Sequence, residues 1–207
     1  MKMKGTALAI LMSLVMVFAM MPMMAGAAYA DSEVVDAGIK YTLHDNGEAT
    51  VSGHTDALQD SVIIPDKIKS GDVDYAVTSI GEDAFSWYKS LVSITIPASV
   101  TSIGGSAFFL CSNLGMVTFE EESKLESIGG SAFRGTGITS ITIPASVTSI
   151  GGSAFLNCSN LGTVAFAEGG KLESIGGSAF RATGLTSIMI PDAFKLASFC
   201  KYYRFKV

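Results

Sequence analysis

The sequence offers few side chains that could carry out catalysis. Its two histidines, His44 and His54, both lie in the N-terminal third of the chain, whereas serines occur throughout. A serine nucleophile needs a histidine within hydrogen-bond reach to accept its proton. A Ser-His pair would therefore require a serine from a distant part of the chain to reach this N-terminal segment. We predict no catalytic residues and expect that the protein is not an enzyme.

Two other motifs could be taken for ligand sites. Gly-Gly-Ser occurs four times, but no Gly-Lys-Ser/Thr follows it, so we interpret it as a structural turn and not as a phosphate-binding loop. The run Glu120-Glu121-Glu122 could hold a cation, yet the equivalent residues 47 positions later are Ala167-Glu168-Gly169. We interpret the acidic run as a solvated loop and predict neither a metal site nor a cofactor.

The first thirty residues have the pattern of an export signal. Lys2 and Lys4 precede an apolar stretch from Ala7 to Met21, and Ala28-Tyr29-Ala30 resembles a cleavage site. The apolar stretch is shorter than the ~20 residues that a membrane-spanning helix needs, which favours a signal peptide over a retained anchor. We therefore predict a signal peptide at residues 1–30 and a protein that is secreted or held at the cell surface, with no membrane span after cleavage.

Removal of this segment makes the chain distinctly acidic. Without Lys2 and Lys4, twelve basic and nineteen acidic residues remain, which gives a formal charge of −7. Ten of the acidic residues fall between Asp31 and Asp74, a density that indicates a solvated N-terminal cap. Because the basic residues are few and scattered, we expect no nucleic-acid partner.

The chain repeats itself at two periods. Shifting it by 47 residues lays Leu91–Gly137 on Ile138–Gly184 without a gap and with few differences. Within each unit, the motif Ser-Ile-Gly-x-x-Ala-Phe recurs every 22 to 25 residues. Its isoleucines are Ile80, Ile103, Ile128, Ile150 and Ile175, and its phenylalanines are Phe85, Phe108, Phe133, Phe155 and Phe180. A period of ~20 to 29 residues is typical of leucine-rich repeats.

A short alternating segment opens each repeat and predicts a strand with one buried face. These segments begin at Leu91, Leu114, Ile138, Leu161 and Leu185. Pro97, Pro144 and Pro191 end three of them. The residues that follow are too few and too rich in glycine for a long helix, so we expect a turn and at most one helical turn on the outer side. The Gly-Gly pairs and prolines also exclude a helical array with a 47-residue period.

The pattern Leu-x-x-Ile-x-Ile-Pro-x-x-Val-x-x-Ile-Gly-x-x-Ala-Phe-x-x-Cys, at Leu91–Cys111 and Ile138–Cys158, resembles the BspA-like leucine-rich repeats of bacterial surface and secreted proteins. The resemblance extends over about Ile39–Pro191. It implies an α/β-type, mostly β solenoid, with short parallel strands on a concave face and turns and short helical segments outside. Upstream, Asp45-Asn46-Gly47 predicts a hairpin turn and Val62–Pro65 a strand.

These observations divide the chain into four parts. We predict a signal peptide at 1–30, an N-terminal cap with the first coil at 31–76, the solenoid at 77–191, and a C-terminal cap or tail at 192–207.

Cys111 and Cys158 occupy the same position two coils apart. Stacked strands rise by ~4.8 Å per coil, which separates the two residues by about 10 Å, beyond the ~7 Å limit between the Cα atoms of a disulfide. We therefore predict two buried free thiols, in the position that Tyr88, Thr136 and Thr183 take in other coils. Cys200 lies in the tail.

Residues between the buried strand positions should face the concave surface. They are Ser93, Thr95, Met116, Thr118, Ser140, Thr142, Thr163, Ala165, Ser187 and Met189. This surface is small, rich in hydroxyl groups and without aromatic anchors of the kind that dominate protein interfaces. It is either a ligand-binding surface or a set of ordinary solvent-facing strand residues.

The tail, Asp192–Val207, departs from the repeat pattern and mixes basic with aromatic residues. They include Lys201, Tyr202, Tyr203, Arg204 and Lys206. Three interpretations stay open: a site for an acidic surface or anionic polymer, a cap over the last coil, or the beginning of further repeats in a longer protein.

The resemblance implies an adhesion or recognition module that binds an extracellular protein or glycan, on a host matrix or another cell surface. The alternative is a structural solenoid of the cell envelope with no ligand of its own.

Overall fold

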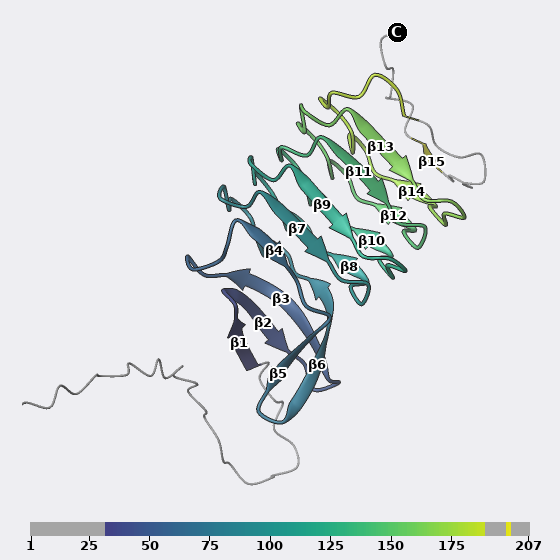
Figure 1. Cartoon of the computed structure of the whole chain (residues 1–207). Coiled ribbons are helices and arrows are strands. Elements are labelled where there is room, and N and C mark those ends of the chain that lie inside the picture. Colours follow the sequence, from purple (N-terminus) through teal and green to yellow (C-terminus); the bar gives the residue numbers. More distant parts are fainter. Residues whose placement is uncertain (1–31, 189–197, 200–207) are drawn as a thin grey trace, which may run out of the picture.

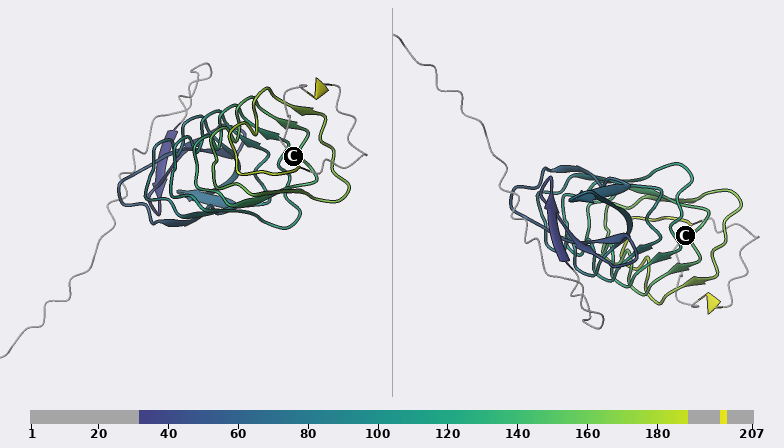
Figure 2. Two further views of the ribbon diagram at one scale, coloured as in Figure 1. Left: turned by 90° about the horizontal axis from the view of Figure 1, so that it is seen from above. Right: turned by 90° about the horizontal axis from the view of Figure 1, so that it is seen from below.

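The computed structural model describes residues 32–188 and 198–199, and it shows a solenoid of stacked coils behind an antiparallel cap (Figure 1). Each coil contributes one strand to each of two sides. We number the coils by the first residue of their leading strand: coil 1 from Ser61, coil 2 from Ser93, coil 3 from Met116, coil 4 from Ser140 and coil 5 from Thr163. Figure 2 shows the same coils from above and from below the view of Figure 1.

The cap is a meander that feeds into the solenoid. Strands β1 (Ser32–Asp36), β2 (Ile39–Leu43) and β3 (Glu48–His54) pair antiparallel. Strand β3 then pairs parallel with β6 (Val73–Ile80). Strand β6 also pairs antiparallel with β5 (Lys67–Ser70), which precedes it in a hairpin. Gly47 has a φ of 80° in the turn between β2 and β3, which confirms the predicted hairpin.

One side of the solenoid is a ladder of two-residue strands that continues from β6. Its members are β8 (Ser102–Ile103), β10 (Ser127–Ile128), β12 (Ser149–Ile150), β14 (Ser174–Ile175) and β15 (Ser198–Phe199). Serine pairs with serine and isoleucine with isoleucine from coil to coil, and β15 places Ser198 opposite Ser174. The ladder therefore extends into the segment that the sequence assigns to a cap or tail.

The other side carries the leading strands, which are parallel as predicted. They are β4 (Ser61–Ile63), β7 (Ser93–Ile96), β9 (Met116–Phe119), β11 (Ser140–Ile143) and β13 (Thr163–Phe166). They form two separate sheets, β4-β7-β9 and β11-β13.

A stack of phenylalanine rings runs through the core. Phe85, Phe108, Phe133, Phe155 and Phe180 are all buried. Adjacent rings are nearly parallel, with centroids 5.0 to 5.3 Å apart. His54 of the cap stacks on Phe85 at 6.0 Å and closes the N-terminal end of the row. Because burial of one such ring contributes ~1.5 to 3 kcal/mol, neighbouring coils stabilise one another through this row.

The helical turn expected on the outer side is wrong. The described residues contain no helix, and so none that is long and apolar enough to cross a membrane. Instead, two residues of each outer turn, four positions apart, take a positive φ, as at Ser106 (54°) and Leu110 (56°). An α-helix cannot continue through such residues. Their N–H groups point to the next coil, where Ser106 donates to Gly130 O at 2.9 Å and Leu110 to Arg134 O at 2.8 Å.

The Gly-Gly pairs allow the coils to approach closely. A Cβ atom on the first glycine of each pair would lie 2.3 to 2.6 Å from backbone atoms of the preceding coil. These residues are Gly104, Gly129, Gly151 and Gly176. Real Cβ atoms do not approach backbone so closely, so glycine is required there and the motif is the structural turn that the sequence predicts.

We predict that Phe155→Ala destabilises the protein by ~3 to 5 kcal/mol, because a central coil cannot refill the lost volume between two stacked neighbours. Phe180→Ala, nearer the end of the row, should cost less. Chemical denaturation of the two variants measures the difference. Equal losses would contradict a stacked array whose end coils are less constrained.

Candidate binding surface

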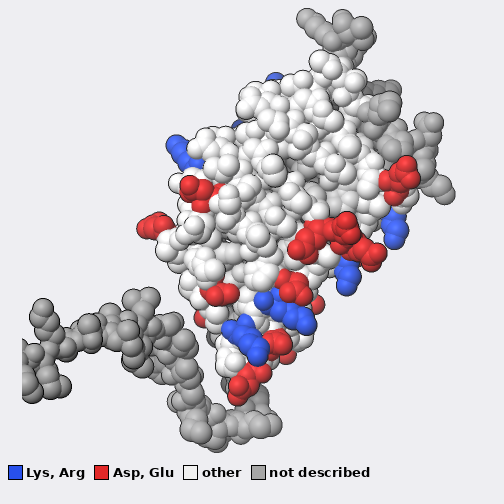
Figure 3. Space-filling model, in the orientation of Figure 1, with Lys and Arg blue, Asp and Glu red and all other residues white. Residues whose placement is uncertain are grey.

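The strand face is the exposed side of the leading strands, and it carries the residues that the sequence singled out. Met116 is 61% exposed, and Thr118, Ser140, Thr142, Thr163, Ala165 and Ser187 are exposed as well. Ser93 and Thr95 are half-buried, and Met189 lies outside the described residues. The register places Ser93 beside Met116, and Ser140 beside Thr163. Figure 3 shows this face as a broad area without charged side chains, with acidic and basic groups along its edges.

Strand β4 extends the face by one coil that the sequence did not assign to it. Ile63 pairs with Thr95 and is 73% exposed, and Ser61 pairs with Ser93. The sequence predicted the strand at Val62–Pro65, but its apolar run hides which side chain faces outward. Only the register with β7 shows that Ile63 belongs to the strand face.

The strand face is interrupted by a seam between coils 3 and 4. No ladder joins β9 to β11 among the described residues, although β9 pairs with β7 and β11 with β13. After β9 and β13, Glu120 N donates to Ile96 O and Ala167 N to Ile143 O, both at 3.0 Å. Proline, which has no N–H to donate, follows both β7 (Pro97) and β11 (Pro144), yet the ladder between β4 and β7 is intact, so Pro144 alone does not account for the seam.

Coil length contributes to the same break. Eight positions separate Phe119 from Ser127 in coil 3, whereas six separate Ile96 from Ser102 in coil 2. Coil 4 has the short connection again, from Ile143 to Ser149, and the turn before β11 is one residue shorter than the turn before β9, so the two 47-residue units meet at an irregular junction.

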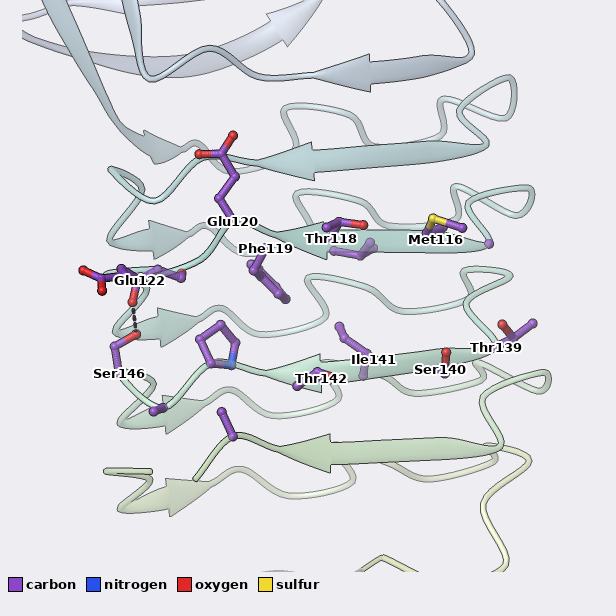
Figure 4. A pocket seen from close by; sticks show the side chains of 16 residues that line it. Met116, Thr118, Phe119, Glu120, Glu122, Thr139, Ser140, Ile141, Thr142 and Ser146 are labelled. Atoms are coloured by element: carbon purple, nitrogen blue, oxygen red, sulfur yellow. Dashed lines mark hydrogen bonds between the residues drawn. The ribbon is translucent and has the colours of Figure 1, made fainter. Parts of the chain in front are cut away.

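A hollow of about 590 Å³ lies over the seam (Figure 4). Met116 and Thr118 line it from β9, and Ser140 and Thr142 line it from β11. Phe119, Ile141 and Pro144 supply apolar surface between these polar walls. The hollow has the size and the mixed lining of a site for a small molecule or for part of a larger ligand.

One end of the hollow is acidic. Glu120 and Glu122 are exposed at its margin, where Ala98 N donates to Glu120 Oε2 at 3.3 Å. Ser146 holds the connecting loop in place, since its hydroxyl donates to Ser123 O at 2.8 Å and to Leu125 O at 2.7 Å. A second hollow of about 420 Å³ shares Glu120 and continues toward Ile63. The described residues contain no group of three or more potential metal ligands.

The histidines lie in the cap, remote from this seam. His44 Nε2 is 2.8 Å from the hydroxyl of Thr50, which in turn is 2.7 Å from that of Ser79. His54 packs against Tyr88, with ring centroids 4.3 Å apart, besides stacking on Phe85. His54 thus packs the cap against coil 1, whereas His44 contacts Thr50 within the cap, and Thr50 links it to Ser79.

The buried cysteines follow the prediction of free thiols. Cys111 donates to Phe85 O and Cys158 to Phe133 O, each at 2.9 Å and each to the preceding coil. Thr136 lies between them, with its hydroxyl 3.2 Å from Cys158 Sγ. Burial raises the pKa of Cys111 to about 12 and also raises the pKa of Cys158. The predicted tail residues Lys201, Tyr202, Tyr203, Arg204 and Lys206, together with Cys200, lie outside the described residues.

Comparison with known families settles the class of the repeat. Residues 78–205 match the model of the BspA type leucine rich repeat region, in six copies. The chain belongs to this family. The matched residues include the segment around β15, in agreement with the continued ladder.

Solved structures give the same fold. A leucine rich cell surface protein from Faecalibacterium prausnitzii A2-165 is 28% identical, with a TM-score of 0.59 over 82% of this chain and 51% of its own. The T. pallidum leucine rich repeat protein TpLRR is 26% identical, with a TM-score of 0.67 over 77% of this chain and 72% of its own. The pneumococcal vaccine antigen PcpA, 24% identical, has a TM-score of 0.65 over 78% of this chain and 50% of its own, and supports the fold alone.

This BspA-type chain spans about half the length of the first and third of these proteins. No curated protein matches it significantly.

We predict that neither Cys111 nor Cys158 reacts with iodoacetamide in the folded protein at about pH 8, because the raised pKa keeps both as neutral, buried thiols and only a thiolate is nucleophilic. Both should react fully in denaturant. Mass spectrometry of non-reduced digests separates them from Cys200. A peptide that links Cys111 to Cys158 would contradict the coil register.

Proposed function

We propose that this BspA-type protein is an exported recognition module that binds an extracellular protein or neutral glycan through its strand face. The ligand would lie on a host matrix or on another cell surface. The observation that carries the proposal is the seam hollow, whose exposed walls come from two different coils and whose rim holds carboxylates.

The chemistry of the walls favours a broad polar ligand. Hydroxyl groups of Thr118, Ser140 and Thr142 can donate and accept hydrogen bonds, and the thioether of Met116 adapts to irregular apolar surface. The absence of charge across this face in Figure 3 removes the desolvation cost that buried charges would add to binding.

Differences between the two 47-residue units also support the proposal. Ten positions differ, and nine of them are exposed or half-buried in both units; the tenth pairs buried Leu91 with buried Ile138. Two of the nine, Met116 against Thr163 and Thr118 against Ala165, lie on the strand face, and three more follow β9 at residues 120, 122 and 123. The buried residues are thus nearly identical in the two units, whereas exposed residues beside the seam differ, as expected for a binding surface on a repeated scaffold.

Export and surface location complete the proposal. Residues 1–30 carry the signal-peptide pattern, and the F. prausnitzii relative is described as a cell surface protein. A recognition module of this kind would meet its ligand outside the cell.

Binding of the purified protein to arrays of matrix proteins, neutral glycans and bacterial cells tests this function. We expect saturable binding that the double variant Ser140→Lys with Thr142→Lys weakens about tenfold or more, since both side chains face the hollow. Its stability should change by less than about 0.5 kcal/mol, because both positions are exposed.

Ser159→Lys, exposed on another side of coil 4, is the matched control and should bind as the wild type does. Absence of binding across all three arrays would instead favour a structural solenoid. Unchanged binding by the double variant would show that the ligand does not bind through the strand face.

A further inference from the structure

A second surface lies along the outer turns. We call turn ridge the two residues that follow each stacked phenylalanine: Ser86-Trp87, Phe109-Leu110, Arg134-Gly135, Leu156-Asn157 and Arg181-Ala182. Backbone hydrogen bonds keep these pairs in register from coil to coil, as in Trp87 N to Phe109 O at 2.7 Å and Asn157 N to Arg181 O at 3.0 Å. The turn ridge is therefore a straight row of side chains, one pair per coil.

Trp87, the single tryptophan of the chain, begins this row in coil 1. It is 59% exposed and has a φ of 64°, a backbone conformation that is costly for a bulky side chain. The coil imposes the same conformation on this position elsewhere, where Gly135 and Asn157 tolerate it well. A large ring at such an exposed position gains little from burial, so packing within the fold does not account for Trp87 there.

The next two coils extend the aromatic surface. The rings of Trp87 and Phe109 meet at 79° with centroids 5.6 Å apart. The guanidinium of Arg134 lies 5.4 Å from the centroid of the Phe109 ring. This cation–π contact holds a positive charge at the end of the aromatic pair.

The turn ridge is basic on an otherwise acidic protein. In coils 2 to 5 its charged members are Arg134 and Arg181, with no acidic residue among its pairs. Lys89 adds a third base beside Trp87. Glu82 and Asp83 precede the ridge in coil 1 and limit the basic strip at that end.

The spacing of the arginines suits a linear polymer. Stacked rings advance by 5.0 to 5.3 Å per coil, so Arg134 and Arg181, two coils apart, recur at roughly 10 Å. One pyranose unit of an extended polysaccharide advances by about one coil spacing. A polysaccharide with an anionic group on every second sugar would therefore place one anionic group beside each of the two arginines.

We propose that the turn ridge binds an anionic polysaccharide. The exposed ring of Trp87, which Phe109 contacts edge to face, stacks against the C–H face of a sugar ring, and Arg134 and Arg181 pair with carboxylate or sulfate groups through charge-assisted hydrogen bonds. This site is separate from the strand face and does not depend on the function proposed for it.

The near-identical units supply variants that preserve the fold. Trp87→Asn and Phe109→Leu install the residues that coil 4 carries at the same positions, Asn157 and Leu156. Arg134→Ser with Arg181→Ser removes both charges from the ridge. Lys67→Ser with Lys171→Ser, which removes two exposed charges outside both proposed surfaces, is the matched control, and thermal melts check that all variants fold.

Titration with heparin oligosaccharides, with neutral dextran and poly-L-glutamate as comparison ligands, tests the proposal. We expect heparin binding that weakens with salt, because ion pairing contributes to it. The paired Trp87→Asn and Phe109→Leu changes should weaken it about tenfold or more, the double arginine variant should abolish it, and the paired Lys67→Ser and Lys171→Ser changes should leave it nearly unchanged.

Heparin affinity that survives both ridge variants would place the site elsewhere and overturn the proposal. Equal affinity for dextran would also overturn it, and so would poly-L-glutamate binding that matches heparin and ignores Trp87. Loss of matrix or neutral-glycan binding in the strand-face variants bears only on the function proposed above, so the two ideas fail separately.

Discussion

Close backbone contact between successive coils determines the rest of this structure. The first glycine of each Gly-Gly pair lies against the preceding coil, where even a methyl group would collide with backbone atoms. This contact sets a coil spacing at which phenylalanine rings stack and at which the Ser-Ile strands form a continuous ladder. It also lets residues of positive φ in the outer turns donate their N–H groups to the next coil. The fold thus depends on main-chain fit as much as on its apolar core.

Both candidate sites lie on parts of the coils that do not take part in this backbone contact, so their residues and local geometry can vary. The Ser-Ile ladder is continuous through the stack, whereas the leading strands separate at the seam between β9 and β11. A local change in coil length is accommodated there, and the hollow lies over this junction. On the turn ridge, the same fixed register presents Trp87, Phe109 and Arg134 on consecutive coils. Because the backbone contact fixes how the coils stack, the side chains on the strand face and the turn ridge can differ from coil to coil.

The sequence predicted what its periodicity encodes and missed what depends on geometry between coils. Ile103 and Phe108 recur with their neighbours, so the strands, the core and the separation of Cys111 from Cys158 followed directly. The seam was not predicted, because no residue type in the sequence indicates where two neighbouring strands fail to pair. The prediction of an outer helical turn was wrong, since the two residues of positive φ in each turn donate their N–H groups to the next coil. Ser198–Phe199 continues the ladder although its sequence no longer matches the motif.

A comparison of Gly151→Ala with Gly152→Ala tests the coil-contact account most directly. A Cβ atom at Gly151 would lie 2.5 Å from Gly130 N, whereas one at Gly152 would lie 3.5 Å from Gly177 O, an ordinary contact. Measured by chemical denaturation, Gly151→Ala should lose about 1 to 3 kcal/mol or more of unfolding free energy, as overpacked sites do. Gly152→Ala should change it little. Equal stabilities for the two variants would contradict the claim that backbone contact at the first glycine sets the stacking of the coils.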